Sequence, residues 1–129
     1  MDEFSISRTV PVLRIFSIAK AKEFYCGFLG FSIDWEHRFG DDFPLYMQVS
    51  RAGLVLHLSE HHGDACPGST VHAEMTGIDA LHRAITAKPY TYYKPSIEHA
   101  DWGARVMSVT DPFGNRIRFS EIDKLPVNC

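Results

Sequence analysis

Histidine is the residue type in this sequence that most suggests chemistry, because its imidazole can bind a metal or move a proton near neutral pH. Seven histidines occur, and His57 opens the pattern H-L-S-E-H, which matches the H-x-x-E-H of zinc proteases. Such a site needs a helix, whereas Leu54, Leu56 and Leu58 alternate as in a strand. On a strand, His57 and His61 would lie about 13 Å apart. Because zinc contacts its ligands at about 2 Å, one ion cannot take both, and we reject a protease site.

A second pattern, His72-Ala73-Glu74, begins like the H-x-E of zinc deaminases but lacks the P-C-x-x-C that follows there. On a strand, the side chains of His72 and Glu74 would share one face, about 6.6 Å apart. Because Val71, Ala73 and Met75 supply the apolar face, the polar pair is expected on the other face. Two alternatives remain open for it: the wall of a ligand cavity, or a polar pair at a sheet edge or subunit seam.

His57 shares its strand face with Val55 and Ser59, opposite the leucines that would pack on a helix. It is either a ligand contact or a hydrogen-bonded interior histidine without a function. A neutral imidazole there would titrate near neutral pH.

The composition bounds the classes of partner. The chain has 129 residues, 45% of them hydrophobic, and a net charge of −3, so we expect one compact domain over residues 1–129. Basic and acidic residues are interspersed, without the cationic stripe that nucleic acid requires. No apolar run reaches the roughly 20 residues that cross a bilayer, so no membrane partner is expected. Three cysteines, an odd number without close spacing, indicate reduced thiols in a cytoplasmic protein.

The chain contains an internal repeat. Residues 53–60 align without gaps on residues 114–121 at an offset of 61, and residues 10–18 align on residues 70–78 at an offset of 60. We therefore expect module one over residues 8–60, a linker over 61–69, module two over 70–121 and a tail over 122–129.

Each module has the pattern of a strand, a helix and three strands. In module one the helix begins after Ser17 and ends at Gly30, and in module two Pro89 ends the helix. The expected strands cover residues 10–16, 31–39, 45–50 and 54–59, then 71–75, 90–93, 105–110 and 116–120.

These modules carry local motifs of a known family. Phe24-Tyr25 is followed by Leu29-Gly30-Phe31, and Asp111-Pro112-Phe113-Gly114-Asn115 precedes the last strand. With the repeat, these motifs resemble the glyoxalase/bleomycin resistance/dioxygenase (vicinal oxygen chelate) superfamily over residues 10–121. The length and two segments, residues 9–13 and 101–103, look most like bleomycin resistance proteins. The resemblance implies an α+β fold of two βαβββ modules that form a curled, cup-like mixed sheet around a ligand.

Enzymes of this superfamily bind a divalent metal through four strand positions, which the motifs carry over to Val10, His57, Thr70 and Arg118. Among these, His57 is a good ligand, Val10 has no donor atom, and Thr70 is a poor one. Arg118 is a permanent cation that would repel a metal. We therefore expect no metal and no cofactor at the family's site. Arg118 would instead pair with Glu74 or hold an acidic group of the ligand.

The resemblance thus implies a non-catalytic small-molecule-binding protein that sequesters an aromatic or bleomycin-like antibiotic and confers resistance to it. Its ligand would stack on Trp102 and meet other contacts from both modules. The residues expected to bind it are His57, Arg118, Trp102, Glu74, His72, Thr70 and Trp35. The family also implies a homodimer with ligands in grooves between subunits, and Pro11 as a hinge for exchange of an N-terminal arm.

Two alternatives accompany this hypothesis. The first is an enzyme, a metal-dependent lyase, isomerase or dioxygenase, in which a two-residue slip on the fifth strand displaces the metal site to His57, His72 and Glu74. The second is a module that regulates or scaffolds a partner and whose cup is vestigial.

Overall fold

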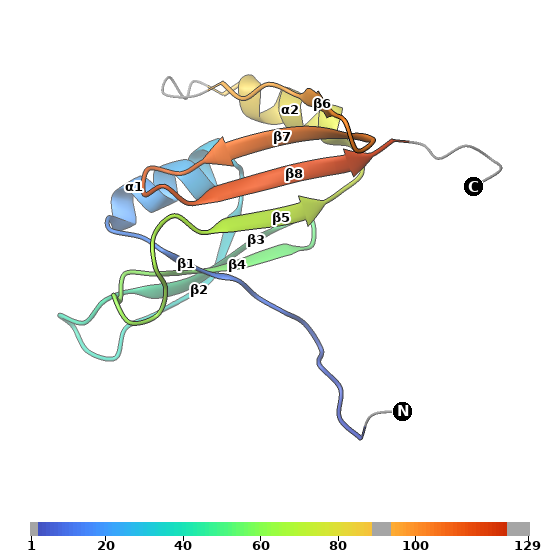
Figure 1. Ribbon diagram of the computed structural model, residues 1–129. Coiled ribbons are helices and arrows are strands. Elements are labelled where there is room, and N and C mark those ends of the chain that lie inside the picture. Colours follow the sequence, from blue (N-terminus) through green and yellow to red (C-terminus); the bar gives the residue numbers. More distant parts are fainter. Residues whose placement is uncertain (1–2, 89–93, 124–129) are drawn as a thin grey trace.

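The computed structural model describes residues 3–88 and 94–123, and in this part of the chain the strands form two four-stranded sheets, one from each half of the sequence. Figure 1 shows the second sheet lying above the first. The first has the order β1-β4-β3-β2 and the second the order β5-β8-β7-β6. This confirms the α+β class and the two repeated βαβββ modules. The eight strands do not close into one sheet within a single chain.

In the first module, β1 (Val12–Arg14) runs parallel to β4 (Leu54–Ser59), and β3 (Tyr46–Arg51) lies antiparallel to both β4 and β2 (Ser32–His37). In the second, β5 (Thr70–Glu74) runs parallel to β8 (Arg116–Ile122), and β7 (Ala104–Thr110) lies antiparallel to both β8 and β6 (Glu98–Ala100). The strand expected at residues 90–93 lies outside the described residues.

The first helix differs from the expectation of a continuous α-helix. Ser17 caps its start by accepting a hydrogen bond from the backbone N–H of Lys20, and α1 (Ile18–Lys22) then passes into the π-helix η1 (Glu23–Phe28). The wider turn is visible in the bond from the Leu29 N–H to the Phe24 carbonyl, 2.9 Å long. The helix of the second module, α2 (Ile78–Thr86), is a regular α-helix.

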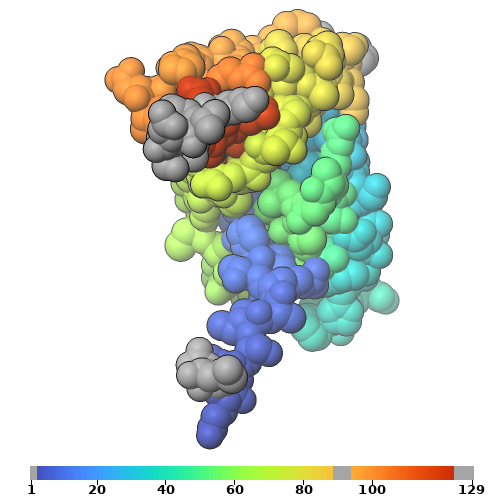
Figure 2. Space-filling view, turned by 90° about the vertical axis from the view of Figure 1, so that its right-hand side faces the viewer, coloured from blue at the N-terminus to red at the C-terminus, as the bar shows by residue number. Residues whose placement is uncertain are grey.

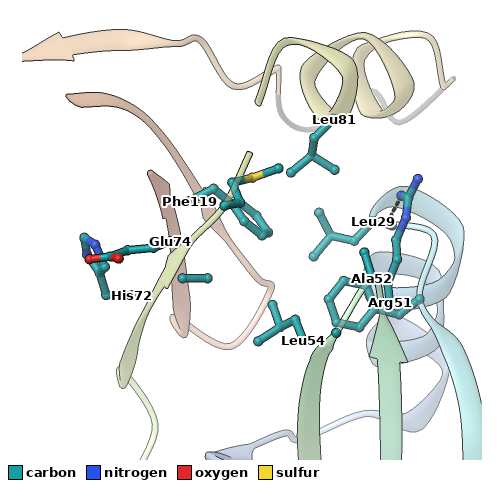
Figure 3. Close-up of a pocket in the computed structure, with 12 residues that line it drawn as sticks. Leu29, Arg51, Ala52, Leu54, His72, Glu74, Leu81 and Phe119 are labelled. Atoms are coloured by element: carbon teal, nitrogen blue, oxygen red, sulfur yellow. Dashed lines mark hydrogen bonds between the residues drawn. The ribbon is translucent and has the colours of Figure 1, made fainter. Parts of the chain in front are cut away.

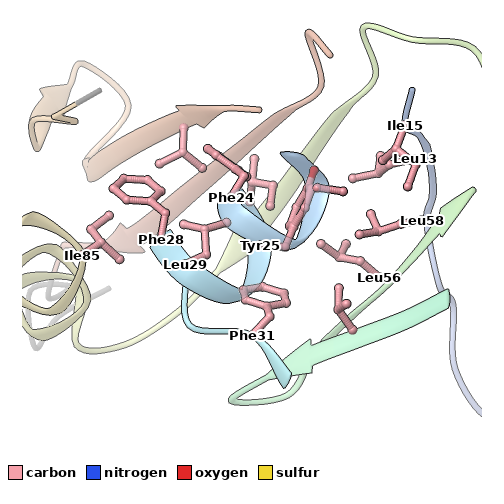
Figure 4. Packing of buried hydrophobic residues seen from close by; sticks show 14 of the residues in the cluster. Leu13, Ile15, Phe24, Tyr25, Phe28, Leu29, Phe31, Leu56, Leu58 and Ile85 are labelled. Atoms are coloured by element: carbon pink, nitrogen blue, oxygen red, sulfur yellow. The ribbon is translucent and has the colours of Figure 1, made fainter. Parts of the chain in front are cut away.

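The core lies where η1 packs between the two modules. Figure 4 shows Phe24, Tyr25, Phe28 and Leu29 of this turn between the β1 and β4 side chains on one side and Ile85 of α2 on the other. All four side chains are buried. Because one cluster includes residues from both modules, the repeated halves share a single core.

A turn with two buried polar side chains, Asp111 and Asn115, also joins the modules. The Asp111 carboxylate accepts hydrogen bonds from the backbone N–H groups of Phe113 and Asn115, both 2.8 Å, and from the Tyr25 hydroxyl, 2.7 Å. Asn115 Nδ2 donates to the Arg14 carbonyl at the end of β1, 2.7 Å away. The turn over residues 111–115 therefore anchors η1 and β1 of the first module to the second.

Strand β2 departs from the strict alternation expected for residues 31–39. Ile33 pairs with Val49, but Trp35 pairs with Gln48, so one extra residue, Asp34, is inserted. Such a β-bulge changes which face the following side chains point to. As a result Asp34 and Trp35 both lie near Gln48, although adjacent residues of a regular strand point to opposite faces.

Candidate ligand-binding site

A row of polar and aromatic side chains crosses the face of the first sheet that points away from the core. His57 of β4 lies opposite Gln48 of β3, which in turn lies opposite Trp35 of β2, and Tyr46 lies two residues from Gln48 on β3. These four residues are called the His57 face. The leucines of β4 point the other way into the core, as the sequence predicted.

Hydrogen bonds link the His57 face into a chain. His57 Nδ1 lies 2.7 Å from the Tyr46 hydroxyl, and His57 Nε2 lies 3.0 Å from Gln48 Oε1. The Gln48 amide donates to Asp34 Oδ2 at 3.0 Å, and its oxygen accepts from Arg8 Nη2 at 3.2 Å. Arginine can only donate and an ionised aspartate can only accept, which fixes the orientation of the amide. His57 therefore carries its proton on Nε2 and accepts the Tyr46 hydroxyl proton at Nδ1.

The surroundings of the hydrogen-bonded residues on the His57 face keep them in one protonation state. Burial lowers the pKa of His57 from its usual 6.5, and the positive charge of Arg8 lowers it further. Hydrogen bonds from Gln48 and Ser50 lower the pKa of Asp34, with a smaller contribution from Arg8. At neutral pH His57 is therefore an uncharged imidazole, and the ionised groups of this hydrogen-bond network are Asp34 and Arg8.

The aromatic rings of the His57 face form an open platform. Trp35 stacks on Tyr46 with ring centroids 5.9 Å apart and planes 10° apart. The imidazole of His57 meets both rings nearly edge-on, at 5.2 Å from each. Trp35 keeps 41% of its surface exposed. A flat molecule could stack on this ring without any rearrangement of the side chains beneath it.

A second group lies on the second sheet. His72 of β5 is opposite Arg118 of β8, and its Nε2 is 3.0 Å from the Ser120 hydroxyl. The indole of Trp102, 58% exposed, lies 6.2 Å from the His72 ring between centroids. These four residues are called the His72 face. Thr70 is the first residue of β5, lies opposite Arg116, and is exposed.

The expected binding residues thus fall into two groups on separate sheets. His57 and Trp35 belong to the first sheet, whereas His72, Arg118 and Trp102 lie together on the second. The backbone register also differs from the pairing implied by the strand positions that were carried over from the family. The neighbour of His57 on β1 is Val12 rather than Val10, and the neighbour of Arg118 on β5 is His72 rather than Thr70.

Four residues extend the network around His57: Tyr46 and Gln48 contact the imidazole, and Asp34 and Arg8 contact Gln48. The sequence suggests Tyr46 only as a further aromatic candidate for ligand contact, and the other three were not expected in the site. The first two had a signal, because positions 46 and 48 share one face of a strand that was expected beside the strand of His57. Asp34 reaches the site through the bulge, and Arg8 lies outside every helix and strand. Neither of these two has a local sequence signal.

The site's suitability for a metal follows from its donor atoms. Within the described residues, no three His, Cys, Asp or Glu side chains are grouped so that they could hold one ion. Both ring nitrogens of His57 are engaged by Tyr46 and Gln48. A metal at His57 would therefore have to displace one of these partners, so the single chain does not fit the metal site of the family's enzymes.

Comparison with known proteins identifies the family. A family model described as glyoxalase superfamily protein matches residues 1–124. The chain belongs to the glyoxalase superfamily. This confirms the resemblance found in the sequence. No curated protein matches this superfamily member. Among the described residues, no helix is long and apolar enough to span a membrane.

Solved structures with the fold of this glyoxalase superfamily member include antibiotic-binding proteins and a glyoxalase-related enzyme. A bleomycin-binding protein from Streptomyces verticillus, complexed with copper(II)-bleomycin, is 28% identical; the match covers 95% of this chain and 99% of that one, with a TM-score of 0.66. A glyoxalase-related enzyme from Clostridium phytofermentans is 22% identical over 95% and 99%, with a TM-score of 0.71. TnmS3, an antibiotic-binding protein from Streptomyces sp. CB03234, is 17% identical over 94% and 100%, with a TM-score of 0.68.

Proposed function

We propose that this chain is a non-catalytic protein that binds a small aromatic molecule of the antibiotic type on its His57 face, and so sequesters it. The observation that carries the proposal is the open stack of Trp35 and Tyr46 beside a histidine that already has both hydrogen-bond partners. Aromatic stacking contributes about 0.5–1.5 kcal/mol beyond the area that it buries. Because the polar groups are satisfied before binding, a stacked ligand leaves none of them unpaired.

The same contacts argue against His57 as a general base. A base must accept a proton from the substrate, but the lone pair at Nδ1 already receives the Tyr46 proton and Nε2 carries a hydrogen. Burial raises the pKa of the Tyr46 phenol, with Asp64 adding to the shift, so Tyr46 remains a donor at neutral pH. The site therefore suits binding better than proton transfer.

The ligand class follows from the site and from similar proteins. The His57 face offers a flat apolar platform with Asp34 and Arg8 at its edge, so a planar molecule with polar substituents of either sign would fit. The protein from Streptomyces verticillus is described as binding bleomycin, and TnmS3 is described as an antibiotic-binding protein. We take bleomycin as the first compound to test, and a role in antibiotic resistance follows if it binds.

A homodimer is part of the proposal. Trp35 and Trp102 are exposed on two different sheets, so two copies facing one another would cover both with a ligand between them. The segment before β1 extends from the body of the protein (Figures 1 and 2) and exposes Phe4 and Ile6, while Arg8 still reaches Gln48 on the first sheet. Pro11 directly precedes β1 and would act as the hinge if the segment is exchanged.

The compartment that we propose is the cytoplasm. Cys26 is half-buried and Cys66 exposed, and both are free thiols. Free thiols persist where the environment is reducing.

The enzyme alternative rests on the same pairing of copies. His72 and Glu74 are exposed on β5, so a facing copy could bring them toward His57 and complete the donor set that one chain lacks. The similarity to a glyoxalase-related enzyme is compatible with this arrangement.

A titration with bleomycin at low salt, measured by calorimetry and by tryptophan fluorescence, tests the proposal. We expect heat of binding and a fluorescence change that survives in Trp102→Phe and is much reduced in Trp35→Phe. No heat at high protein concentration would exclude bleomycin, and no response from either tryptophan to a panel of aromatic antibiotics would exclude the function. Metal analysis of protein purified without a histidine tag separates the alternative: a stoichiometric metal that is lost in His57→Ala would favour the enzyme.

A further inference from the structure

A cavity of about 380 Å³ lies between the two modules and is separate from the His57 face. Strands β5 and β8 and helix α2 line it from the second module, and the end of η1 and the turn between β3 and β4 line it from the first. Leu54 of β4 borders it, and on that strand the leucines point away from the face that carries His57. Its volume falls in the range of small-molecule sites, about 300–1,000 Å³.

The centre of this inter-module cavity is apolar. Figure 3 shows Leu29, Leu54, Leu81 and Phe119 directed toward the same space, and Met75 of the segment after β5 also lines it. Leu54, Leu81 and Met75 are only partly buried, so their apolar surface remains in contact with water. An apolar occupant would remove this surface from water, which is favourable by about 25 cal/mol per Å².

One end of the inter-module cavity carries positive charge. Arg51 lines it and donates a hydrogen bond from Nη1 to the Leu29 carbonyl. Lys88 lies just outside the cavity lining: a Cβ built on Gly30 would lie 2.6 Å from Arg51 Nη1 and 3.3 Å from Lys88 Nζ, so the two cations are close neighbours. Each lies near the C-terminal end of a helix, η1 or α2, whose partial negative charge favours a cation.

These two cations have no carboxylate partner among the described residues: no ion pair within 4.0 Å involves Arg51 or Lys88. Like charges at close range repel one another, and an anion placed between them would relieve the repulsion. The Arg51 guanidinium has further N–H groups beyond the one that Leu29 engages, and its planar fork suits a carboxylate.

The opposite edge of the cavity is unfavourable for an anion. His72 and Glu74 line that edge, and Figure 3 shows their side chains on the side of β5 away from the leucines. The Glu74 carboxylate would repel a negative head group placed there.

We propose that the inter-module cavity binds a carboxylate with an apolar chain, its head at Arg51 and Lys88 and its chain among the leucines and Phe119. This proposal does not depend on what the His57 face binds.

Three probes with the same ten-carbon chain test the site: decanoate, decanol and decyltrimethylammonium, with an anionic, a neutral and a cationic head. Calorimetry measures the affinity, and the methyl resonance of Met75 in protein labelled at methionine methyl groups reports the location. We expect decanoate to shift the Met75 signal and to bind at least about tenfold more tightly than decanol, with the cation weakest. Equal affinity for all three probes, or binding that leaves Met75 unmoved and perturbs His57 instead, would overturn the proposal.

Variants assign the head and the chain. Arg51→Gln is expected to weaken decanoate binding by about tenfold while leaving decanol unchanged, and Arg51→Lys to retain most of the affinity. Arg116→Gln, which removes an exposed cation of β8 outside the cavity lining, is the matched control and should bind decanoate normally. Ala73→Phe fills the cavity and should abolish binding of both probes. If Arg51→Gln does not fold, Lys88→Gln takes its place; normal decanoate affinity in that variant would refute the assigned head site.

Discussion

The buried bond between Tyr25 and Asp111 allows a quantitative prediction for Tyr25→Phe. Tyr25 is 1% exposed and Asp111 5% exposed, and the hydroxyl donates to Asp111 Oδ2 over 2.7 Å. Phenylalanine keeps the ring and its packing, so the substitution removes the hydrogen bond without opening a large cavity. A hydrogen bond to a charged group contributes about 1.5–3 kcal/mol.

We therefore expect Tyr25→Phe to lower the free energy of unfolding by about 1.5–3 kcal/mol. The Asp111 carboxylate keeps three other donors, two from the backbone of its own turn and one from the Asn115 amide. The loss should therefore stay within this range and not abolish folding. Urea unfolding at pH 7 measures it, and Tyr46→Phe, which removes a hydroxyl from the partly exposed His57 face, should cost no more than about 1.5 kcal/mol.

The pH dependence of stability provides an independent check on this bond. Burial raises the pKa of Tyr25 well above 10, and the negative charge of Asp111 raises it further. The unfolded chain therefore releases this proton at a lower pH than the folded protein does. The stability from Tyr25 is fully present below about pH 10 and is lost as the pH rises above it. Tyr25→Phe should lose less stability than the wild type between pH 9 and 11. A Tyr25→Phe protein as stable as the wild type, with the same alkaline profile, would refute this account of the bond.

Three further predictions concern single residues. Arg8→Gln should raise the pKa of His57, because a positive charge is removed, and the rise should shrink in high salt; proton NMR titration that shows a fall would contradict the proposed network. Because the pKa of His57 is lowered, the wild type should lose stability as the pH falls through 6.5, and thermal unfolding of His57→Gln should show a smaller acid loss. Ser17→Ala should cost about 1 kcal/mol through loss of the α1 cap, and an unchanged urea midpoint would exclude a role for that cap.

The sequence was informative where local periodicity coincides with the final packing. The alternation of Leu54, Leu56 and Leu58 predicted both a strand and the face on which His57 would lie, because a strand buried on one face must alternate. The repeat predicted the order of strands and helix in each module, because each copy keeps its own local pattern of strand and helix.

The rest depended on interactions that periodicity does not encode. The bulge at Asp34 needs no special residue type, so Trp35 was expected on the same face as Ile33, whereas its strand partner places it beside Gln48. The hydrogen bond from Arg8 spans forty positions and comes from a segment without regular structure. The turn at residues 111–115 was identified as a family motif, but its bonds to η1 and β1 became evident only in three dimensions.

The turn over residues 111–115 has a consequence for the order in which the chain can fold. Its bonds to Tyr25 and Arg14 join positions 86 and 101 residues apart. During synthesis, the first module is complete long before Asp111 and Asn115 leave the ribosome, so its helix and first strand must wait for their partners. Contacts of such high sequence separation slow folding and leave apolar surface open in the interval. The packing of the first module therefore cannot be completed before the second module has been made.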